Sequence, residues 1–484
     1  MQAARINPEI FREYDIRGVV GRDLSPEAVR QIGMAYGSFM QRKELWLLDE
    51  GWPYKTHHIA GDGPPTVIVG KDNRKSSPEL RDWLIDGIIS TGCNVLDIGT
   101  VVTPVFYFAR IYYGIEAGVQ ITGSHNPPEF NGFKIGKGPG TMYGAEIQRL
   151  KEVIEQGWFV RSAVEGTVEK ADPVNAYAAD LLERVVVTGK KLKVVVDCGN
   201  GTASFIAPRV LQALGCEVVP LYCDSDPDFP NHFPDPVIPA NLQELSRKVV
   251  ETGADLGVAY DGDADRIGVV DDTGAIIPGD ILMALFWREI LPKHPGALAI
   301  IEVKCSQALV REVEKLGGEP MFWKAGHSLI KAKMRETGAV FSGELSGHMF
   351  FADEHYGYDD AIYASARLIR MVAAAGKPLS QLWDDIPRYH STPEVRVSCP
   401  DAVKFDVVER IKEKLEGSRP IVDVDGVRVE YPEYRGWALV RASNTQPVLV
   451  LRAESETDAG LQSIQAEMEK WLREAGLVWK GFEE

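Results

Sequence analysis

Apolar runs of β-strand length alternate along the chain with stretches of helical length, and one such pattern occurs three times. Each copy starts with an apolar run and, after a helix-length connection, returns as a second run: residues 67–70 and 92–96, 194–197 and 214–219, and 297–303 and 317–322. Helical spacing over 79–89 and 307–316 supplies two of the connections. Such alternation is typical of βαβ units. The pattern predicts three related α/β domains with mixed, mostly parallel sheets.

The pattern changes from about residue 392 onward. Apolar and polar residues alternate over 427–431 and again within 438–452, as in antiparallel strands, and helical periodicity covers 404–415 and 457–476. This segment predicts a C-terminal α+β domain. Clusters of Pro, Gly and polar residues indicate linkers, which divide the chain into predicted domains at 1–171, 172–276, 277–392 and 393–484.

A further apolar run in each α/β domain ends in an unusually polar loop. The runs cover residues 118–121, 256–260 and 339–341, and the loops that follow begin at Thr122, Asp261 and Ser342. In open α/β sheets, ligands bind beyond the carboxyl ends of the strands. We therefore expect the active site in a central cleft lined by these loops.

Composition excludes several classes of protein. The 484 residues are 45% apolar and 25% charged, as in globular proteins of several domains. The net charge of −17 disfavours nucleic acid and anionic membrane surfaces as partners. The apolar run at 281–287 is far shorter than the roughly 20 residues of a membrane helix. The six cysteines form no CxxC pair, so we expect reduced thiols and a soluble, cytoplasmic protein.

The loop after residue 260 carries three alternating carboxylates, Asp261, Asp263 and Asp265. Oxygen ligands alone favour Mg²⁺ or Ca²⁺ over zinc. A calcium-binding EF-hand is disfavoured, because Arg266 and Asp272 stand where that loop needs Gly and Glu. A solvated turn remains the alternative, although the adjacent Arg266 favours a loop that faces phosphate.

Ser124 lies between Gly123 and His125 in a loop closed by prolines. A serine hydroxyl needs a base or a metal ion to act as a nucleophile. The G-x-S-x-G elbow of α/β-hydrolases is not matched, because Thr122 and Asn126 occupy the glycine positions. Serine hydrolase chemistry is therefore disfavoured, and an ordinary turn remains open for this loop.

Two later loops carry groups suited to a phosphorylated sugar. Glu344, Ser346 and His348 alternate in a glycine-bounded loop and suit sugar hydroxyls, whereas residues 441–445 offer a guanidinium, hydroxyls and an amide that suit phosphate. Polar turns without a ligand are the alternative for both. In an acidic chain, an anionic substrate requires local positive charge, for which the candidates are Arg17, Lys134, Arg266 and Lys304.

Taken together, these loops resemble the signatures of the α-D-phosphohexomutase superfamily, and specifically its bacterial phosphomannomutase/phosphoglucomutase branch. The resemblance spans nearly the whole chain and includes four segments in order, at residues 122–127, 261–266, 343–348 and 441–447, together with 14–18 and 324–328. The chain departs from the family at Lys71, Ala264 and Leu345, where Arg, Gly and Met are common. None of these departures removes a ligand or nucleophile.

The resemblance implies a phosphohexomutase, an intramolecular phosphotransferase that interconverts hexose 1-phosphate and hexose 6-phosphate of glucose or mannose. It implies a phosphoserine at Ser124, a hexose 1,6-bisphosphate intermediate and activator, and one Mg²⁺ held by Ser124, Asp261, Asp263 and Asp265. The implied catalytic residues are Ser124, His125, Arg17, Lys134 and His348. The implied substrate-binding residues are Tyr14, Arg266, Lys304, His327, Glu344, Ser346, His348, Arg441, Ser443, Asn444 and Thr445.

Several alternatives stay open at this point. A phosphoglucosamine mutase usually carries Gln at the position of Leu345, which disfavours an amino-sugar substrate without excluding it. A sugar-phosphate phosphatase would pass the phosphoryl group to water, and a sugar-phosphate-binding regulator would perform no reaction. The expected partner is a small phosphosugar, and the expected assembly is a monomer or a homodimer.

Overall fold

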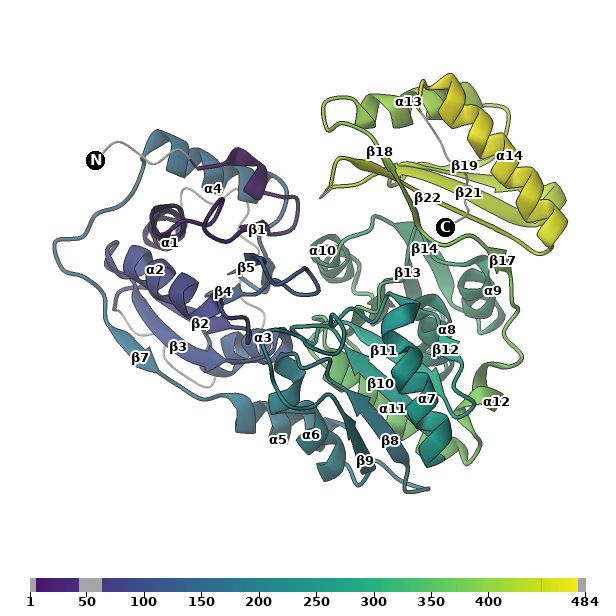
Figure 1. Ribbon diagram of the computed structural model, residues 1–484, viewed down its shortest axis with the longest axis horizontal. Helices are drawn as coiled ribbons and strands as arrows, with labels where there is room; N and C mark the ends of the chain where they lie inside the picture. The colour runs from purple at the N-terminus through teal and green to yellow at the C-terminus, as the bar shows by residue number, and fades with distance from the viewer. Residues whose placement is uncertain (1–5, 43–62, 445, 478–484) are drawn as a thin grey trace. The chain divides into compact units, whose positions relative to one another are not determined.

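The computed structural model describes residues 6–42, 63–444 and 446–477 (Figure 1). These residues fold into two compact units. The first unit comprises Met1–Pro278 and Ser346–Leu382, and the second comprises Gly279–Leu345 and Trp383–Glu484. The described residues form four β-sheets. None of the helices in this described part combines the length and the apolar character needed to cross a bilayer.

The first sheet of the first unit is mixed, with the order β1-β5-β4-β2-β3-β7 and β6 paired with β5. Strands β4, β2, β3 and β7 run parallel, whereas β5 pairs antiparallel with both β4 and β1. The strands are β1 (Ile16–Val19), β2 (Thr66–Lys71), β3 (Asn94–Thr100), β4 (Ala117–Ile121), β5 (Phe130–Lys137), β6 (Gly140–Thr141) and β7 (Val168–Lys170). The associated helices are η1 (Pro8–Ile10), α1 (Pro26–Gln41), α2 (Ser77–Ile89), α3 (Thr103–Tyr113) and α4 (Ala145–Gln156).

The second sheet has the order β12-β11-β10-β8-β9, in which β10, β8 and β9 are parallel and β11 and β12 antiparallel. Its strands are β8 (Lys193–Asp197), β9 (Glu217–Leu221), β10 (Leu256–Tyr260), β11 (Ile267–Asp271) and β12 (Ile276–Ile277). The other elements of the first unit are α5 (Val174–Arg184), η3 (Thr202–Phe205), α6 (Ala207–Ala213), η4 (Pro239–Leu242), α7 (Gln243–Thr252), α11 (Ala361–Ala375), α12 (Leu379–Trp383) and β16 (Met349–Phe351), a strand that is not part of this second sheet.

The second unit begins with a parallel core in which β13 pairs with both β14 and β15. These elements are α8 (Gly279–Ile290), β13 (Leu298–Glu302), α9 (Gln307–Lys315), β14 (Glu319–Trp323), α10 (His327–Thr337) and β15 (Phe341–Gly343). The last sheet is antiparallel, with the order β17-β22-β21-β20-β19 and β18 on β22. It is formed by β17 (His390–Ser391), β18 (Val395–Ser398), β19 (Ile421–Val422), β20 (Val427–Tyr431), β21 (Gly436–Ala442) and β22 (Val448–Ser455), with η5 (Pro432–Tyr434).

Two helices, α13 (Lys404–Leu415) and α14 (Asp458–Glu474), pack on one face of this last sheet (Figure 1). Their apolar residues, among them Val407, Ile411, Leu461 and Ile464, are buried against the strands. This is the α+β arrangement that the change of pattern after residue 392 predicts. The predicted fold class is therefore confirmed in its three α/β sheets, of which two are mixed and the third has a parallel core, and in its antiparallel C-terminal sheet.

Most predicted elements form close to their expected positions. Helix α13 and strands β10 and β20 have the expected bounds, and the run at 438–452 divides between β21 and β22. The strand predicted at 339–341 is wrong in its position, because β15 covers Phe341–Gly343. Helix α10 extends to Thr337, and Gly338, with φ +71°, caps it in a left-handed conformation that a strand cannot include.

The carboxyl end of β8 carries an ion pair whose strength depends on pH. His232 Nε2 lies 3.0 Å from Oδ2 of the buried Asp197, and its Nδ1 lies 2.9 Å from the carbonyl of Phe233. Burial alone would lower the pKa of His232, but the hydrogen bond and charge of Asp197 raise it above its ordinary value. The protonated imidazole is therefore the form that the folded protein stabilises.

We expect His232→Asn to destabilise the protein more at pH 5.5 than at pH 8.5. The histidine's contribution is fully present below the unfolded-state pKa of about 6.5 and is lost as pH rises through the higher folded-state pKa. The loss at low pH should approach the roughly 1.5–3 kcal/mol of a hydrogen bond to a charged group. Urea denaturation of both proteins at the two pH values measures the difference, and an equal loss at both would contradict the assignment.

Candidate functional site

Three buried carboxylates converge in the loop between β10 and β11. The side chains of Asp261, Asp263 and Asp265 are fully buried, and one ligand oxygen from each lies within 4.8 Å of the others. The turn is tight because Ala264 adopts a left-handed conformation, with φ +60°. Backbone amides of Asp265 and Arg266 donate to Asp261 Oδ1 at 3.0 and 3.1 Å, which fixes the first carboxylate inside the loop.

Lys134 on β5 supplies positive charge to this cluster. Its ammonium lies 3.0 Å from Asp263 Oδ2 and also contacts Asp265 Oδ2. Burial would lower the pKa of Lys134, but the carboxylates of Asp263 and Asp265 hold it well above its usual value. Burial would likewise raise the pKa of Asp265, but Lys134 and His348 hold it well below its usual value. Both groups are therefore charged near neutral pH.

The donor set fits a small divalent cation. Burial, followed by the charges of Asp265 and Asp263, raises the pKa of Asp261. The positive side chains around the loop therefore do not balance all of the negative charge of the three carboxylates. Asp263 Oδ1 is buried and has no hydrogen-bond partner among the described residues, which leaves a carboxylate oxygen for a ligand. Oxygen donors without thiols are typical of Mg²⁺ sites. The predicted triad is thus assembled as a metal centre requires.

Ser124 reaches this cluster from the loop after β4. Its hydroxyl donates to Asp261 Oδ2 at 2.8 Å, and its backbone adopts the left-handed region, with φ +48°. The two loops touch at Gly262, where an added Cβ would lie 2.4 Å from the carbonyl oxygen of Ser124. Only glycine allows this close approach, so the sequence Asp-Gly-Asp is needed for packing as well as for charge.

His125 follows Ser124 and is neutral in the folded protein. Its Nδ1 lies 3.2 Å from the hydroxyl oxygen of Ser124. Burial, together with the positive charges of Arg266 and Arg17, lowers the pKa of His125 well below its usual value. A neutral imidazole beside a serine hydroxyl can accept or donate one hydrogen bond without adding charge to the site.

The Ser124 loop rests on two residues that the sequence did not indicate. The guanidinium of Arg74 is buried and donates to the carbonyls of Ser124 at 2.8 Å and Pro127 at 2.7 Å. The carboxylate of Asp72 accepts from the amide of Gly123 at 3.0 Å and pairs with Arg74 Nε at 3.3 Å. Their only sequence signal is a position just after β2, at the same sheet edge as the end of β4.

Arg17 on β1 lies beside the same loop. Its guanidinium donates to Asn126 Oδ1 at 2.8 Å and pairs with Asp15 at 2.6 Å. The Nε of Arg17 is buried without a hydrogen-bond partner among the described residues, so part of its donor capacity remains for a ligand. Tyr14, the other candidate in this segment, is half-buried in the bend before β1.

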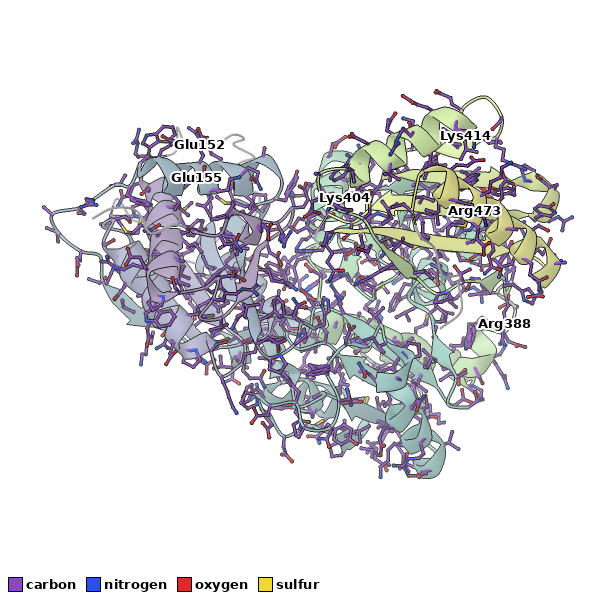
Figure 2. All side chains as sticks on the ribbon, turned by 45° about the horizontal axis from the view of Figure 1, so that its top comes forward. Glu152, Glu155, Arg388, Lys404, Lys414 and Arg473 are labelled. Atoms are coloured by element: carbon purple, nitrogen blue, oxygen red, sulfur yellow. The ribbon has the colours of Figure 1, made fainter. Side chains whose placement is uncertain are left out.

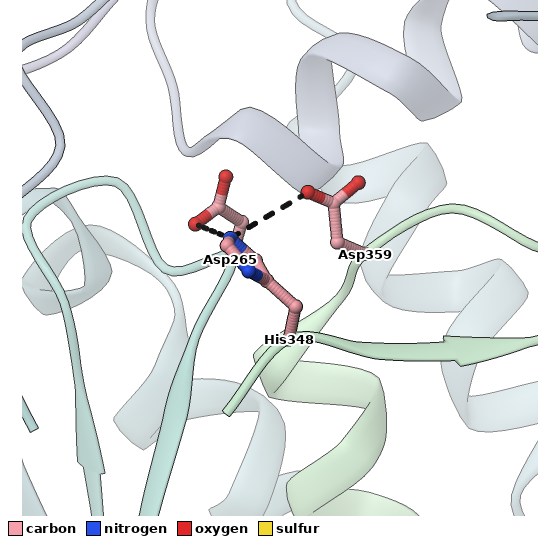
Figure 3. Close-up of side chains that lie close together, drawn as sticks. All are labelled: Asp265, His348 and Asp359. Atoms are coloured by element: carbon pink, nitrogen blue, oxygen red, sulfur yellow. Dashed lines mark hydrogen bonds and ion pairs between the residues drawn. The ribbon is translucent and has the colours of Figure 1, made fainter. Parts of the chain in front are cut away.

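His348 joins the cluster from the segment before β16. Its Nε2 lies 3.1 Å from Asp265 Oδ1 and 3.9 Å from Asp359 Oδ2, and dashed lines mark these contacts in Figure 3. Arg266 Nε lies 3.3 Å from the same nitrogen, and Ser346 Oγ lies 3.3 Å from Nδ1. Asp359 was not predicted, because it lies just before α11 and outside the polar loops that the sequence indicates. Only folding brings it close to His348.

Thr103 is a further residue that the sequence did not indicate. Its hydroxyl donates to Asp263 Oδ2 at 2.7 Å, and its amide donates to the carbonyl of Asp263 at 2.9 Å. It lies at the start of α3, so the end of this helix that carries unpaired amides faces the acidic loop. This placement favours the negative charge that the loop carries.

The second unit holds a different set of candidates around Lys304. Its ammonium lies 3.0 Å from both Glu302 Oε1 and Glu394 Oε2. Burial would lower the pKa of Lys304, but these carboxylates raise it. The charge of Lys304 in turn holds the pKa of Glu394 at about 2. Lys304 is therefore a fixed positive charge held by two carboxylates.

Glu344 and Arg441 are linked through the loop before α10. Glu344 Oε1 accepts from the amide of Gly326 at 2.7 Å, which positions it beside His327, the first residue of α10. The neighbouring amide of Ala325 donates to Asp425 Oδ2 at 3.0 Å, and Arg441 Nη2 pairs with that same oxygen at 2.9 Å. Asp425 was not predicted, yet it connects the loop of His327 to the guanidinium of Arg441.

The loop after β21 carries the remaining candidates. Lys404, labelled in Figure 2 on α13, donates to the carbonyls of Ser443 at 2.5 Å and Gln446 at 3.1 Å. Ser443 Oγ accepts from the amide of Gln446 at 3.2 Å, so the loop closes on itself. Asn444 is half-buried within it, whereas Thr445 lies outside the described residues.

The candidates thus fall into two sets, one in each unit. The first unit brings together the hydroxyl, the acidic triad and the surrounding cationic and imidazole groups: Arg17, Ser124, His125, Lys134, Asp261, Asp263, Asp265, Arg266, Ser346 and His348. The second unit holds Lys304, His327, Glu344, Arg441, Ser443 and Asn444. The first set is suited to phosphoryl chemistry, and the second is suited to binding an anionic, hydroxyl-rich ligand.

Comparison with known proteins finds matches along nearly the whole chain. Models of the phosphoglucomutase/phosphomannomutase alpha/beta/alpha domains I, II and III match residues 8–160, 175–274 and 278–389, and the model of the C-terminal domain matches 394–470. A phosphomannomutase/phosphoglucomutase of Pseudomonas aeruginosa is 43% identical over 473 residues, which cover 98% of this chain and 97% of that protein. A phosphoglucomutase of Neisseria gonorrhoeae is 39% identical, with 96% of each chain covered.

A crystal structure of a phosphoglucomutase/phosphomannomutase family protein from Burkholderia thailandensis superimposes with a TM-score of 0.87. That protein is 41% identical to this chain, and the match covers 98% of both. The sequence identity extends over nearly the full length of both chains. The four family models also match in their expected order along this chain. The chain belongs to the phosphoglucomutase/phosphomannomutase family.

Proposed function

We propose that this enzyme interconverts the 1-phosphates and 6-phosphates of glucose and mannose through a phosphoserine at Ser124 and a hexose 1,6-bisphosphate intermediate. The observation that carries the proposal is the hydroxyl of Ser124, held 2.8 Å from Asp261 Oδ2 at the edge of the acidic triad. A hydroxyl in this position can carry a phosphoryl group whose charge is met by the cationic groups around it.

The proposed reaction has two balanced transfers. In the first, the P–O bond to Ser124 breaks, a P–O bond forms to the free hydroxyl of the hexose phosphate, and the proton of that hydroxyl leaves to the protein. The bisphosphate then turns round within the site. In the second transfer, its other phosphate returns to Ser124, and the sugar oxygen takes a proton back.

Asp261, Asp263 and Asp265 would hold Mg²⁺ together with an oxygen of the phosphorylated Ser124. When bound, the ion would neutralise charge on the transferring phosphoryl group. Lys134 keeps two of these carboxylates paired with an ammonium, and Thr103 orients Asp263 by a hydrogen bond of 2.7 Å. These contacts fix the carboxylates before a ligand binds.

The side chains around Ser124 suggest which group moves the proton. Lys134 stays protonated, because neighbouring carboxylates raise its pKa, and an arginine such as Arg17 keeps its charge at any physiological pH. Of these candidates, the imidazole of His348 is left to accept and return the proton. Arg17, whose buried Nε has no partner in the described part of the chain, would instead stabilise charge on the phosphoryl group.

Residues of both sets would bind the sugar and its non-reacting phosphate. Arg441, Ser443, Asn444 and Thr445 would hold its phosphate, while Glu344 and Ser346 would bind the 3- and 4-hydroxyls, which glucose and mannose share. Tyr14, Arg266, Lys304 and His327 would complete the set of substrate-binding residues. A site with these contacts ignores the 2-hydroxyl, so it accepts both sugars.

The remaining predictions from the sequence fit this proposal. The domain boundaries at residues 171/172, 276/277 and 392/393 would place one signature loop in each domain. All six cysteines are free thiols, which supports a cytoplasmic location. We propose a small phosphosugar as the partner and a monomer or homodimer as the assembly.

A coupled assay tests the proposed function. Purified protein with Mg²⁺ and catalytic hexose 1,6-bisphosphate should convert glucose 1-phosphate and mannose 1-phosphate to the 6-phosphates, and glucosamine 1-phosphate more slowly. A parallel assay for inorganic phosphate should remain at background. Release of phosphate without a 6-phosphate product would replace the mutase with a phosphatase, and no turnover at all would leave only a binding protein.

We expect Arg441→Ala to raise KM for both the 1-phosphate and the 6-phosphate substrate by about tenfold or more, because a guanidinium–phosphate pair contributes at least ~1.5 kcal/mol. Its guanidinium is presented by Asp425, so its position does not depend on the substrate. Arg410→Ala, an exposed arginine of α13, is the matched control and should leave both KM values unchanged. A KM change for only one substrate would contradict a phosphate site that serves both orientations.

A further inference from the structure

Two cysteines meet at the carboxyl edge of the second sheet. Cys198 directly follows β8, Cys223 follows β9 by two residues, and these parallel strands are neighbours. Their sulfur atoms are 3.5 Å apart. In the β8–β9 register Asp197 pairs with Leu221, so Cys198 and Cys223 both lie just beyond the last paired residues. The S–S bond of a disulfide is about 2.0 Å long. An approach of about 1.5 Å between the sulfurs would therefore bring them to bonding distance.

The two thiols differ in a way that suits stepwise oxidation. Cys198 is fully buried, and burial raises its pKa well above the usual value. Cys223 is partly exposed, and its hydrogen bond with Cys198 lowers its pKa. An accessible, more acidic thiol reacts first with an oxidant, and a buried neighbour then resolves the product.

We propose that Cys198 and Cys223 are a modification site, a dithiol that peroxide closes reversibly to a disulfide. The thiol of Cys223 gives up its proton and its thiolate attacks hydrogen peroxide. The O–O bond breaks, sulfenic acid forms, and the hydroxide that leaves takes up the proton to become water. The thiol of Cys198 then attacks the sulfenic sulfur, an S–S bond forms, and a second water leaves. Each peroxide is reduced by two electrons, which the two thiols supply, and a dithiol reductant reverses the reaction.

The position of Cys198 couples this site to the acidic loop. Cys198 opens the turn at 198–202, and its carbonyl accepts from the amide of Gly201 at 2.7 Å. The amide of Thr202 at the other end of this turn donates to the carbonyl of Gly262 at 3.0 Å. Gly262 in turn packs against the Ser124 backbone with no space for a side chain.

Movement of Cys198 towards Cys223 therefore displaces the turn that supports Gly262. Because Gly262 lies between Asp261 and Asp263, the oxidised form holds the triad and Ser124 less well. We expect a several-fold fall in turnover, restored by dithiothreitol. This effect on turnover rests on the proposed function, whereas formation of the disulfide does not.

The test starts from the full-length protein, reduced and freed of reductant, and then treated with increasing hydrogen peroxide. Trypsin without reduction should release peptide 194–209, with Cys198, joined to peptide 210–247, with Cys216 and Cys223, at a mass two hydrogens below the sum. Cys223→Ser should lose the joined peptide. Cys216→Ser is the matched control, because burial raises the pKa of that thiol to about 11, and it should keep the joined peptide.

Activity measured on the same samples completes the test. Turnover of wild-type protein and of Cys216→Ser should fall with peroxide and recover with dithiothreitol, whereas Cys223→Ser should resist. Absence of the joined peptide, or its persistence in Cys223→Ser, would overturn the modification site. A joined peptide with unchanged turnover would overturn the coupling to the acidic loop. If the reduced protein shows no mutase activity, the proposed function fails. The presence or absence of the joined peptide still shows whether Cys198 and Cys223 form the disulfide.

Discussion

Ser124→Ala should lower mutase turnover by roughly 10³-fold or more, since loss of a covalent nucleophile in other enzymes costs up to about 10⁶. The substitution removes the only atom that the proposed reaction phosphorylates on the protein, while the acidic triad and the sugar-binding residues remain. Alanine tolerates the left-handed backbone at this position no worse than serine does, so the loop should keep its conformation. Steady-state assays in both directions measure the loss, and intact mass should show that phosphate no longer attaches to the protein.

Ser365→Ala provides a matched control for the loss of a buried hydroxyl. Ser365 is fully buried on α11, accepts from Tyr260 Oη at 2.9 Å and donates to the carbonyl of Ala361 at 2.8 Å. Each variant should lose about 1–3 kcal/mol of stability through an unpaired polar group, but only Ser124→Ala should lose turnover. If Ser124→Ala kept wild-type turnover, the phosphoserine mechanism would be wrong.

The sequence predicted that the three carboxylates converge, because all of them lie in one loop. Asp261, Asp263 and Asp265 follow an apolar strand at once and alternate with small residues, so convergence of their side chains depends on few distant contacts. The same holds for the fold class, because strand and helix periods are local properties. Helix α13 was predicted to the residue, since apolar positions such as Val407 and Ile411 repeat at helical spacing.

The residues that hold the loops in place could not be predicted in this way. Arg74 and Asp72 support the backbone around Ser124 from about 50 residues away in sequence, and only the pairing of β2 with β4 brings them there. Asp359 and Asp425 likewise act through partners on distant segments. Local patterns carry no information about such contacts, so buried charges outside a motif are found only once the fold is known.

Lys134→Met should destabilise the protein strongly, and Mg²⁺ should reverse much of the loss. Lys134 is buried and is the ammonium that contacts both Asp263 and Asp265, so its removal leaves these fully buried carboxylates without their main counter-charge. Removing one partner of a buried ion pair typically costs about 3–5 kcal/mol. A divalent cation bound by the same carboxylates stabilises the folded state by mass action. Urea denaturation in EDTA and in millimolar Mg²⁺ measures both effects without any assay of activity.

The matched control is Lys75→Met, which removes an exposed ion pair with Asp228 elsewhere in the same unit. Surface pairs contribute under about 1 kcal/mol, so this variant should stay close to wild type in EDTA and should gain from Mg²⁺ only as much as wild type does. The gain for Lys134→Met should be larger, because the cation then offsets a greater excess of buried negative charge. An equal gain in both variants would mean that Mg²⁺ binds away from the triad, and the assignment of Asp261, Asp263 and Asp265 as its ligands would fail.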